Sequence, residues 1–398
     1  NEAQKNAIAE QETALKAMKD PKRIEEAKKA LNQTRGRIPK VMVMKDREKH
    51  RPTYILKTGL YDQRGEEVEA GVPEALPPLP DPEDADRLDL ARWLVSPNHP
   101  LTARVTVNRF WQMLFGIGLV KTAEDFGVQS EYPRQKELLD WLAVEFVESG
   151  WNLKRLIRTI VTSETYQRSS KIASPEVHER DPDNRLLARG PRFRLSAEMV
   201  RDQALQVSGL LSKKMHGPPV NPRQPKIGLS AAFGGGIDWK VSEGEDQYRR
   251  GLYTTWRRSN PYPSMATFDA PNREVCVVRR DRTNTPLQAL VTLNDPVFME
   301  AAQSLARKLA AKGLSPEDTV DQAIWKCLSR PSNDSERQSL ASLYNKTYER
   351  LKQEPDRALP LATDPIGPAP EGSDLVALAS WAVVSNVILN LDEIFLKP

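Results

Sequence analysis

A chain of 398 residues is long enough for two or three domains with a buried core, and its 39% hydrophobic and 28% charged residues lie close to globular averages. This balance excludes wholesale disorder. The longest apolar run, residues 375–391, is interrupted by serines and asparagines, so we expect a buried helix there and no transmembrane segment. The net charge of +4 predicts no general affinity for nucleic acid, so any electrostatic partner must bind a local surface.

The sequence carries none of the motifs that usually hold a metal, a haem or a nucleotide. Cys276 and Cys327 lack the paired spacing of a zinc ribbon, a redox CxxC or a haem-attaching CxxCH motif. We interpret them as isolated buried thiols, with a single bridge in an oxidising compartment as the alternative. The four histidines stand apart, and GxGxxG, P-loop and GxSxG motifs are absent. We therefore expect no cofactor in this chain, which starts at Asn1 and which we expect to be a processed or excised piece.

Composition divides the chain into three parts. Residues 1–37 are charged and rich in Ala, Lys, Glu and Gln, which predicts a helix or helical hairpin at the end of an upstream domain. Residues 38–85 contain the pieces KVMVMKD and TYILKTGLYD and then the proline-rich ALPPLPDPED, which predict a small β element and a stiff linker. Residues 86–398 are expected to form a mainly helical domain.

Helical spacing of apolar residues recurs through most of the third part. Between residues 86 and 168 it predicts a bundle whose core includes Trp93, Phe110, Trp111, Trp141, Phe146 and Leu156. Further helices are expected over 192–211, 285–312, 316–328, 333–353 and 374–391. An insert at about 217–283 should be irregular with some β structure, because it holds a loop rich in proline and glycine and then the alternating RRGLYTTWRR. The fold class is thus mainly α, with a helical bundle-like core, small β elements and long irregular loops.

The insert concentrates arginine. Eight arginines and no lysine stand in its second half, namely Arg249, Arg250, Arg257, Arg258, Arg273, Arg279, Arg280 and Arg282. Guanidinium groups offer planar, bidentate donors suited to carboxylate, sulfate or phosphate, so this bias indicates a surface that recognises anions. The alternative is that the arginines pair internally and fix irregular loops. The acidic residues nearby are Glu243, Glu245, Asp246, Asp269, Glu274 and Asp281.

Polar side chains are also dense between residues 267 and 295. The candidate substrate-binding residues are Arg257, Arg258, Asn272, Arg273, Arg279, Arg280, Arg282 and Asn284. Asp269 and Glu274 are candidate catalytic carboxylates for acid/base work, although they lack the spacing of a calcium loop. The run TNTP looks like a helix start, with Asn284 or Thr285 as the cap, so Asn284 also has a structural interpretation.

Three long motifs resemble one known family. They are RLDLARWLVSPNHPLTARVTVNRFWQMLFGIGLVKTAEDFG, ELLDWLAVEFVESGWNLKRLIRTIVTSETYQRSS and FDAPNREVCVVRRDRTNTPLQALVTLND. The family is the planctomycete-specific domain of unknown function that accompanies planctomycete cytochrome C domains. The resemblance runs from about Arg87 to the end of the chain and implies a periplasmic or cell-surface protein. It also implies a c-type haem in an upstream module or partner, since this chain has no CxxCH.

Two functions are consistent with these features. One is a redox-associated component that works with a c-type cytochrome, with carbohydrate as the substrate and Asp269 or Glu274 as the base. The other is a non-catalytic scaffold domain whose arginines bind an acidic polysaccharide or a partner subunit. A deep pocket at the arginines favours the enzyme, and an open basic face favours the binding domain.

Overall fold

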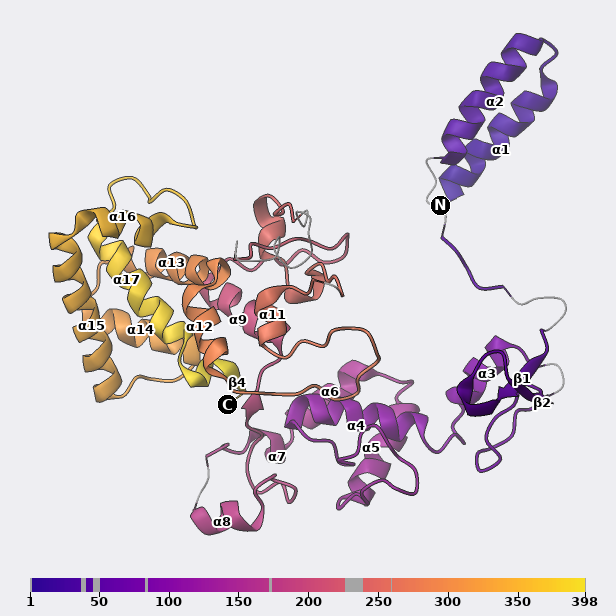
Figure 1. The fold of residues 1–398 in the computed structure, drawn as a ribbon, viewed down its shortest axis with the longest axis horizontal. Coiled ribbons are helices and arrows are strands. Elements are labelled where there is room, and N and C mark those ends of the chain that lie inside the picture. Colours follow the sequence, from indigo (N-terminus) through magenta and orange to yellow (C-terminus); the bar gives the residue numbers. More distant parts are fainter. Residues whose placement is uncertain are drawn as a thin grey trace. The chain divides into compact units, whose positions relative to one another are not determined.

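A computed structural model describes residues 2–36, 41–45, 51–82, 85–171, 174–225, 239–258 and 260–397 (Figure 1). The chain forms two compact units, Asn1–Ser96 and Pro97–Pro398. Helices dominate the described residues and strands are short and few, which confirms the prediction of a mainly α protein. The domain limits expected at residues 37 and 85 remain predictions.

The first unit begins with a helical hairpin, as its composition predicts. Helix α1 (Glu2–Ala17) packs against α2 (Pro21–Gly36), and Arg35 forms an ion pair with Glu12 across the two helices. An antiparallel pair of strands follows, β1 (Thr53–Leu56) and β2 (Arg64–Val68), joined through the 3-10 turn η1 (Lys57–Gly59). The expected strand in KVMVMKD is wrong for residues 41–45, which form no strand and are exposed, while its first and last residues lie outside the described residues.

Helix α3 (Arg87–Leu94) closes the first unit. Asp86 caps it, because its carboxylate accepts from the backbone N–H groups of Leu88 and Asp89 while Asp89 accepts from the N–H of Asp86. The buried Trp93 donates its indole N–H to the carbonyl oxygen of Pro77 at 2.6 Å. The proline-rich segment is therefore fixed against this helix.

The second unit begins with α4 (Thr102–Phe115), α5 (Lys136–Glu148), α6 (Leu153–Val161), α7 (Glu164–Gln167) and α8 (Pro175–Arg180). Trp111, Phe146 and Leu156 are buried in one cluster, as their spacing predicts. The prediction for Trp141 is wrong, because 54% of this residue is exposed. The buried stripe of α5 runs through Leu139, Leu142, Ala143 and Phe146, so the helical period turns position 141 outward.

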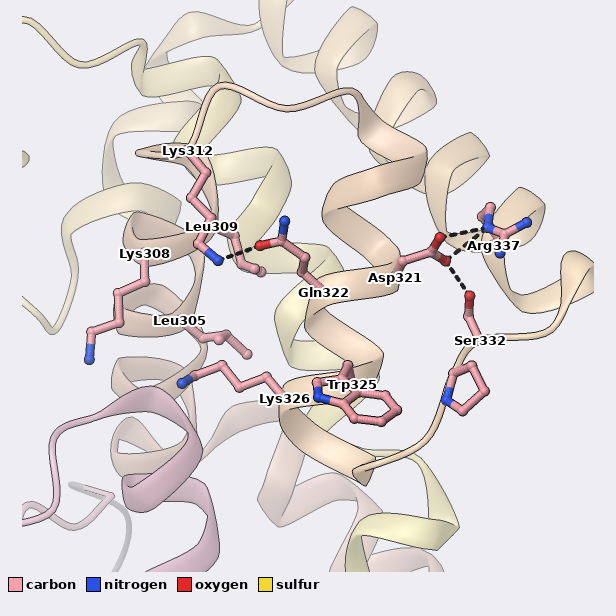
Figure 2. Close-up of a pocket in the computed structure, with 11 residues that line it drawn as sticks. Leu305, Lys308, Leu309, Lys312, Asp321, Gln322, Trp325, Lys326, Ser332 and Arg337 are labelled. Atoms are coloured by element: carbon pink, nitrogen blue, oxygen red, sulfur yellow. Dashed lines mark hydrogen bonds and ion pairs between the residues drawn. The ribbon is translucent and has the colours of Figure 1, made fainter.

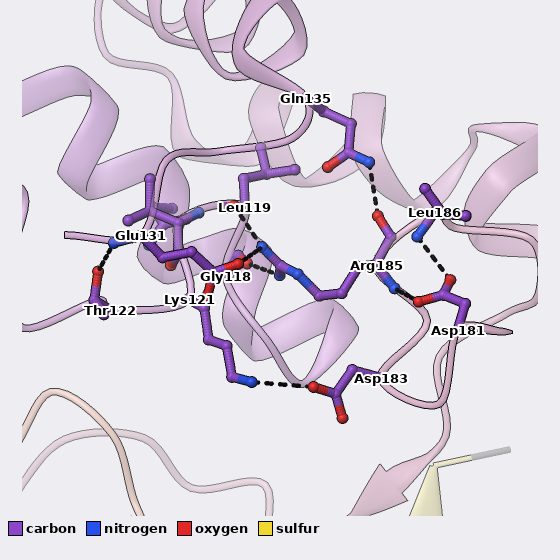
Figure 3. A network of polar contacts seen from close by, with 12 residues as sticks. Gly118, Leu119, Lys121, Thr122, Glu131, Gln135, Asp181, Asp183, Arg185 and Leu186 are labelled. Atoms are coloured by element: carbon purple, nitrogen blue, oxygen red, sulfur yellow. Dashed lines mark hydrogen bonds and ion pairs between the residues drawn. The ribbon is translucent and has the colours of Figure 1, made fainter. Parts of the chain in front are cut away.

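A polar network fastens the segment after α8 to this helical cluster (Figure 3). The guanidinium of Arg185 donates to the carbonyl oxygens of Gly118 at 2.6 Å and Leu119 at 2.9 Å. The carboxylate of Asp181 accepts the backbone N–H groups of Arg185 and Leu186 at 2.7 and 2.8 Å. The buried Asn108 similarly binds both backbone groups of Val120, at 3.0 and 2.9 Å. These irregular segments therefore satisfy their backbone groups through side chains.

The rest of the second unit is a larger helical assembly. Its helices are α9 (Ala197–Ser208), α11 (Pro263–Thr267), α12 (Pro286–Asn294), α13 (Pro296–Ala310), α14 (Pro316–Leu328), α15 (Asp334–Gln353), α16 (Pro355–Thr363) and α17 (Leu375–Leu389). Helices α13 and α17 pack together at the centre of the main hydrophobic cluster (Figure 1). The short strand β3 (Phe193–Arg194) pairs antiparallel with β4 (Leu396–Lys397), after the 3-10 turn η4 (Asp392–Phe395), and so ties in the end of the chain.

Helix α17 confirms the interpretation of the long apolar run as a buried helix, with Ala379, Val384 and Ile388 fully covered. Within the described part of the chain, no helix combines the length and the apolar character that crossing a membrane requires.

Two details of the helical assembly differ from the sequence prediction. The helix expected over 285–312 is two helices, because Asp295 caps α13 and Pro296 occupies its first position. The segment RRGLYTTWRR contains the 3-10 turn η3 (Gly251–Tyr253), preceded by η2 (Gly244–Tyr248), and pairs only through isolated bridges.

Candidate functional site

The arginines of the insert have different roles, and Arg249 is a structural one. It is 1% exposed, and its guanidinium donates to the carbonyl oxygens of Pro218 at 3.1 Å and of His216. The same group lies over the ring of Tyr253, 3.6 Å from its centroid. Arg249 therefore fixes the loop before it and is not available to a ligand.

The next three arginines range from paired to free. Arg250 lies 3.4 Å from the carboxylate of Asp202, which also accepts the N–H of Gly251 at 2.6 Å. Arg257 is half-buried and bridges through its backbone to Asn260. Arg258 is exposed and makes no hydrogen bond or ion pair with a described residue. Of these three, Arg258 is the one that is exposed and has no partner among the described residues.

Residues 269–283 form a closed loop, which we call the arginine loop. The carboxylate of Asp269 accepts the backbone N–H of Thr283 at 2.7 Å and its hydroxyl at 2.9 Å. Asp269 itself has φ of 60°, a left-handed conformation that Asp tolerates better than most residues. Because the two ends are joined in this way, the intervening residues form one loop anchored at its base.

The arginine loop connects α11 to α12 (Figure 1). Along it, Arg280 pairs with Glu198 of α9 at 2.6 Å and Arg279 lies 3.7 Å from Glu124. Arg282 donates to the carbonyl oxygen of Gly116 at 3.2 Å and lies over the ring of Phe193. Arg273 lies over the ring of Trp256, 5.0 Å from its centroid.

None of these ion pairs uses the nearby carboxylates that the sequence suggested. Glu245 accepts from Ser212, and Asp246 pairs with Lys214. The partners of the arginines come instead from α9 and from the segment after α4, which are distant in the sequence. The side chains of Arg279 and Arg280 remain 57% and 40% exposed, so pairing leaves part of each guanidinium accessible to solvent.

The other candidate residues of the loop bind one another. Asn272 donates to the Glu274 carboxylate at 2.9 Å and accepts the backbone N–H of Glu274 at 3.1 Å. The helix start at TNTP is confirmed, with Thr285 as the cap and Pro286 at the first position, and Asn284 is exposed beside it. Both candidate catalytic carboxylates, Asp269 and Glu274, therefore hold the loop's own groups.

Apolar side chains accompany the arginines. Val275 is 69% exposed and Val277 is 47% exposed, with the exposed Cys276 between them. On α12, which follows the arginine loop directly, Leu287 and Leu290 are each 57% exposed and lie one turn apart. This part of the surface thus combines guanidinium groups with uncovered aliphatic groups.

A second group of polar residues is buried and was not predicted. Glu300 of α13 is 3% exposed, accepts the Tyr248 hydroxyl at 2.7 Å and lies 3.6 Å from Arg223. Asp295 is equally buried and accepts the hydroxyl of Ser264 at 2.5 Å. Burial raises the pKa of both carboxyl groups above their ordinary values.

Arg201 of α9 supplies positive charge to this cluster. It is 3% exposed, and its Nη2 donates to the carbonyl oxygen of Gln247 at 2.7 Å, while Nε and Nη1 have no partner among the described residues. The cavity beside it, lined by Tyr262 and Ser264 among others, has a volume of about 10 Å³. That volume suits one water molecule rather than a substrate. We therefore interpret the cluster as structural, since its residues join η2, α9, α11 and α13.

The sequence did contain a signal for this cluster. Arg201 falls within the buried stripe formed by Ala197, Val200 and Ala204 of α9. Glu300 lies between the buried pairs 297–298 and 301–302 of α13. A charged residue inside an apolar helical stripe must find a partner in the protein interior. Two stripes that each contain a charged residue therefore predict that the two helices meet at these residues.

The described residues contain no group of three or more His, Cys, Asp or Glu side chains that is placed to hold a metal ion. The two cysteines are free thiols in different environments. Cys276 is exposed, which corrects its interpretation as buried, whereas Cys327 is buried and burial raises its pKa to about 12.

The fold and this surface define a mainly helical domain with a closed, exposed arginine loop. The family described as protein of unknown function (DUF1553), PSD1, matches residues 86–344, a range that contains α3 and the whole arginine loop. The chain belongs to this family, which confirms the resemblance that its motifs indicated. No curated protein and no solved structure matches the chain.

Proposed function

We propose that the second unit is a non-catalytic partner-binding domain whose arginine loop and α12 dock an acidic, partly apolar protein surface. The observation that carries this proposal is the exposure of Val275, Val277, Leu287 and Leu290 beside guanidinium groups. Arginine and apolar side chains together are typical of the centre of a protein interface. An acidic polysaccharide would pair with the arginines but would leave these aliphatic groups in water, so a protein partner fits better.

The geometry of the loop supports binding in a second way. The Asp269 carboxylate closes the loop at its base, and Trp256 holds the Arg273 guanidinium in place. Because the side chains are already positioned, little conformational entropy is lost when a partner binds. Arg258 and Arg273 make no ion pair with a described carboxylate. An acidic partner can therefore pair with these two arginines without displacing an internal carboxylate.

The first candidate partner is a c-type cytochrome module, either upstream in the same protein or a separate subunit. This choice, like the periplasmic or cell-surface location, follows from the family resemblance. A redox-associated role on carbohydrate would require Asp269 or Glu274 as the base. Both carboxylates already hold groups of the loop, Thr283 and Asn272 respectively, and we therefore rank binding ahead of catalysis.

Cys276 allows a direct test, because it is an exposed thiol in the middle of the arginine loop. A photoactivatable maleimide attached to Cys276 should crosslink an acidic partner in an extracytoplasmic extract of the source organism. The captured protein is then purified, and its affinity for the unlabelled domain is measured by calorimetry. We expect the double variants R273A/R279A and V275D/V277D to weaken binding at least tenfold, because each removes one of the two contributions to the interface.

The matched control carries Cys276→Ser and places the same label at Glu349→Cys, an exposed position of α15. Crosslinked products shared by both labels are discarded as nonspecific. If no purified partner distinguishes the wild-type loop from its two double variants, the proposed function is wrong. Salt-dependent binding of an acidic polysaccharide that needs the arginines but not the valines would favour the polysaccharide alternative instead.

A further inference from the structure

An open groove runs beside α14, formed by different elements from the arginine loop (Figure 2). Helix α13 supplies Lys308, and the turn after it supplies Lys312. Helix α14 supplies Trp325 and Lys326, and the turn after it supplies Pro331. The groove has a volume of about 700 Å³, within the range of sites that hold small molecules.

Trp325 is the most unusual residue of the groove, because 61% of this large aromatic residue is exposed. The buried stripe of α14 passes through Val320, Ala323, Ile324 and Cys327, so Trp325 projects from the outer face of the helix. In Figure 2 its indole ring lies beside the segment that leads from the end of α14 to Ser332. A flat aromatic face is thus available to a ligand.

Positive charge also lines the groove, on the side of α14 toward α13 (Figure 2). Lys308 and Lys326 make no ion pair or hydrogen bond with a described residue, and Lys312 donates to Gln322. Burial lowers the pKa of Lys308, and the charge of Lys326 lowers it further, which indicates that the two ammonium groups repel each other. The Lys308 ammonium packs over Gly209, at the C-terminus of α9.

The carboxylate in the groove is already occupied. Asp321 accepts from Nε of Arg337 at 2.8 and 3.0 Å and from the hydroxyl of Ser332, and these contacts lower its pKa. The dashed lines in Figure 2 show that they lie on the side of α14 away from Lys308. An anion that entered beside Lys308 and Lys326 would therefore relieve repulsion between the lysines rather than compete with an internal carboxylate.

We infer that this groove binds an anionic saccharide, a sugar that carries a carboxylate or a sulfate. The apolar C–H face of the sugar ring packs on the indole of Trp325, and the anionic group pairs with Lys308 and Lys326. A neutral sugar would leave the lysines unpaired, and an acidic peptide would lack the flat face for the indole. The inference is independent of the arginine loop and of its protein partner.

The test uses the full chain and two acidic probes, trigalacturonate and a chondroitin sulfate tetrasaccharide, with maltotriose as the neutral probe. Calorimetry should detect binding of at least one acidic probe. The chain should bind that probe at least tenfold more tightly than it binds maltotriose. W325A and the double variant K308Q/K326Q should each weaken that binding at least tenfold, whereas W325F should retain part of it.

Trp141→Ala provides a matched control, because Trp141 is another exposed tryptophan and belongs to α5. Thermal unfolding of each variant checks that it still folds. If W325A does not fold, the binding measured with W325F still decides the test. The inference is overturned if neither acidic probe binds, if W325A binds as the wild type does, or if poly-glutamate binds as tightly as the saccharides. Loss of saccharide binding in R273A/R279A alone would move the site to the arginine loop and would also overturn it.

Discussion

The carboxylate of Asp269 accepts both the backbone N–H and the hydroxyl of Thr283, and this pair closes the arginine loop at its base. Asp269→Ala should open the loop, because it removes these bonds and places at a positive φ an alanine, which tolerates that conformation less well than aspartate does. The free energy required to open the loop should fall by about 1–2 kcal/mol. Hydrogen exchange of amides 272–282 should then be roughly tenfold faster.

Asp269→Asn is the matched variant for that experiment. Its side-chain oxygen still accepts from Thr283, and asparagine tolerates the left-handed conformation, so its effect on exchange should be smaller. Equal exchange rates in wild type and Asp269→Ala would show that other contacts hold the loop.

Gly116 should be needed for the contact between α4 and the arginine loop. It has φ of 87°, and a β-carbon there would lie 2.9 Å from the ring of Phe193 and 3.2 Å from Arg282. Gly150 has φ of 71° with open space around it, so Gly150→Ala isolates the backbone cost, about 1–2 kcal/mol. Urea unfolding should show that Gly116→Ala costs about 1–3 kcal/mol more. Equal costs for the two variants would mean that the site relaxes freely.

The buried Glu300 should make stability depend on pH in a defined direction. Its pKa is raised above the ordinary 4.5 mainly by burial, so the folded state favours the protonated carboxyl. This contribution is fully present below pH 4.5 and is lost as the pH rises through the raised pKa. The Gln side chain of Glu300→Gln still accepts from Tyr248 but cannot ionise.

Urea unfolding between pH 4.5 and 8 checks this prediction. The stability of the wild type relative to Glu300→Gln should fall as the pH rises and then level off. Glu349→Gln, at an exposed position, should show no such trend relative to the wild type. A stability difference that grows with pH would mean that the Arg223 ion pair outweighs burial.

The two thiols should differ in reactivity. Cys276 is exposed and should react with a thiol reagent in the native protein. Cys327 is buried with a pKa raised to about 12, so it should react only after unfolding. Titration with a chromogenic disulfide should give one thiol before denaturation and two after it. Two fast thiols in the native protein would mean that the region around α14 opens readily.

The binding function predicts no redox activity from the loop carboxylates. Purified chain mixed with candidate sugars and an oxidised c-type cytochrome should leave the haem oxidised, since Asp269 and Glu274 hold Thr283 and Asn272. The measurement is the absorbance of reduced haem, and Glu274→Gln is the comparison variant. Reduction by wild type that disappears in Glu274→Gln would restore the enzyme hypothesis.

The sequence alone determined the features that depend on short-range physics. Helix α14 follows its cap Ser315 and begins at Pro316, and α15 follows Asn333, whose side chain caps it together with Glu336. Such caps act within one turn of the helix, so the residues that form them are neighbours in the sequence. The buried helix α17 was predicted for a related reason, because a helix that is apolar on most sides has to be covered.

The tertiary structure decided which side chains are free. Arg249 and Arg258 look alike in the sequence, yet one is buried under Tyr253 and the other is exposed. Trp141 and Trp111 both follow helical spacing, yet Trp111 is buried in the cluster with α5 and α6 and Trp141 is 54% exposed. The carboxylates that pair with Arg279 and Arg280 lie more than 80 positions away in the sequence. The two residues of the Arg280 pair, for example, are 82 positions apart. Burial and pairing depend on which distant elements meet, and local patterns do not contain that information.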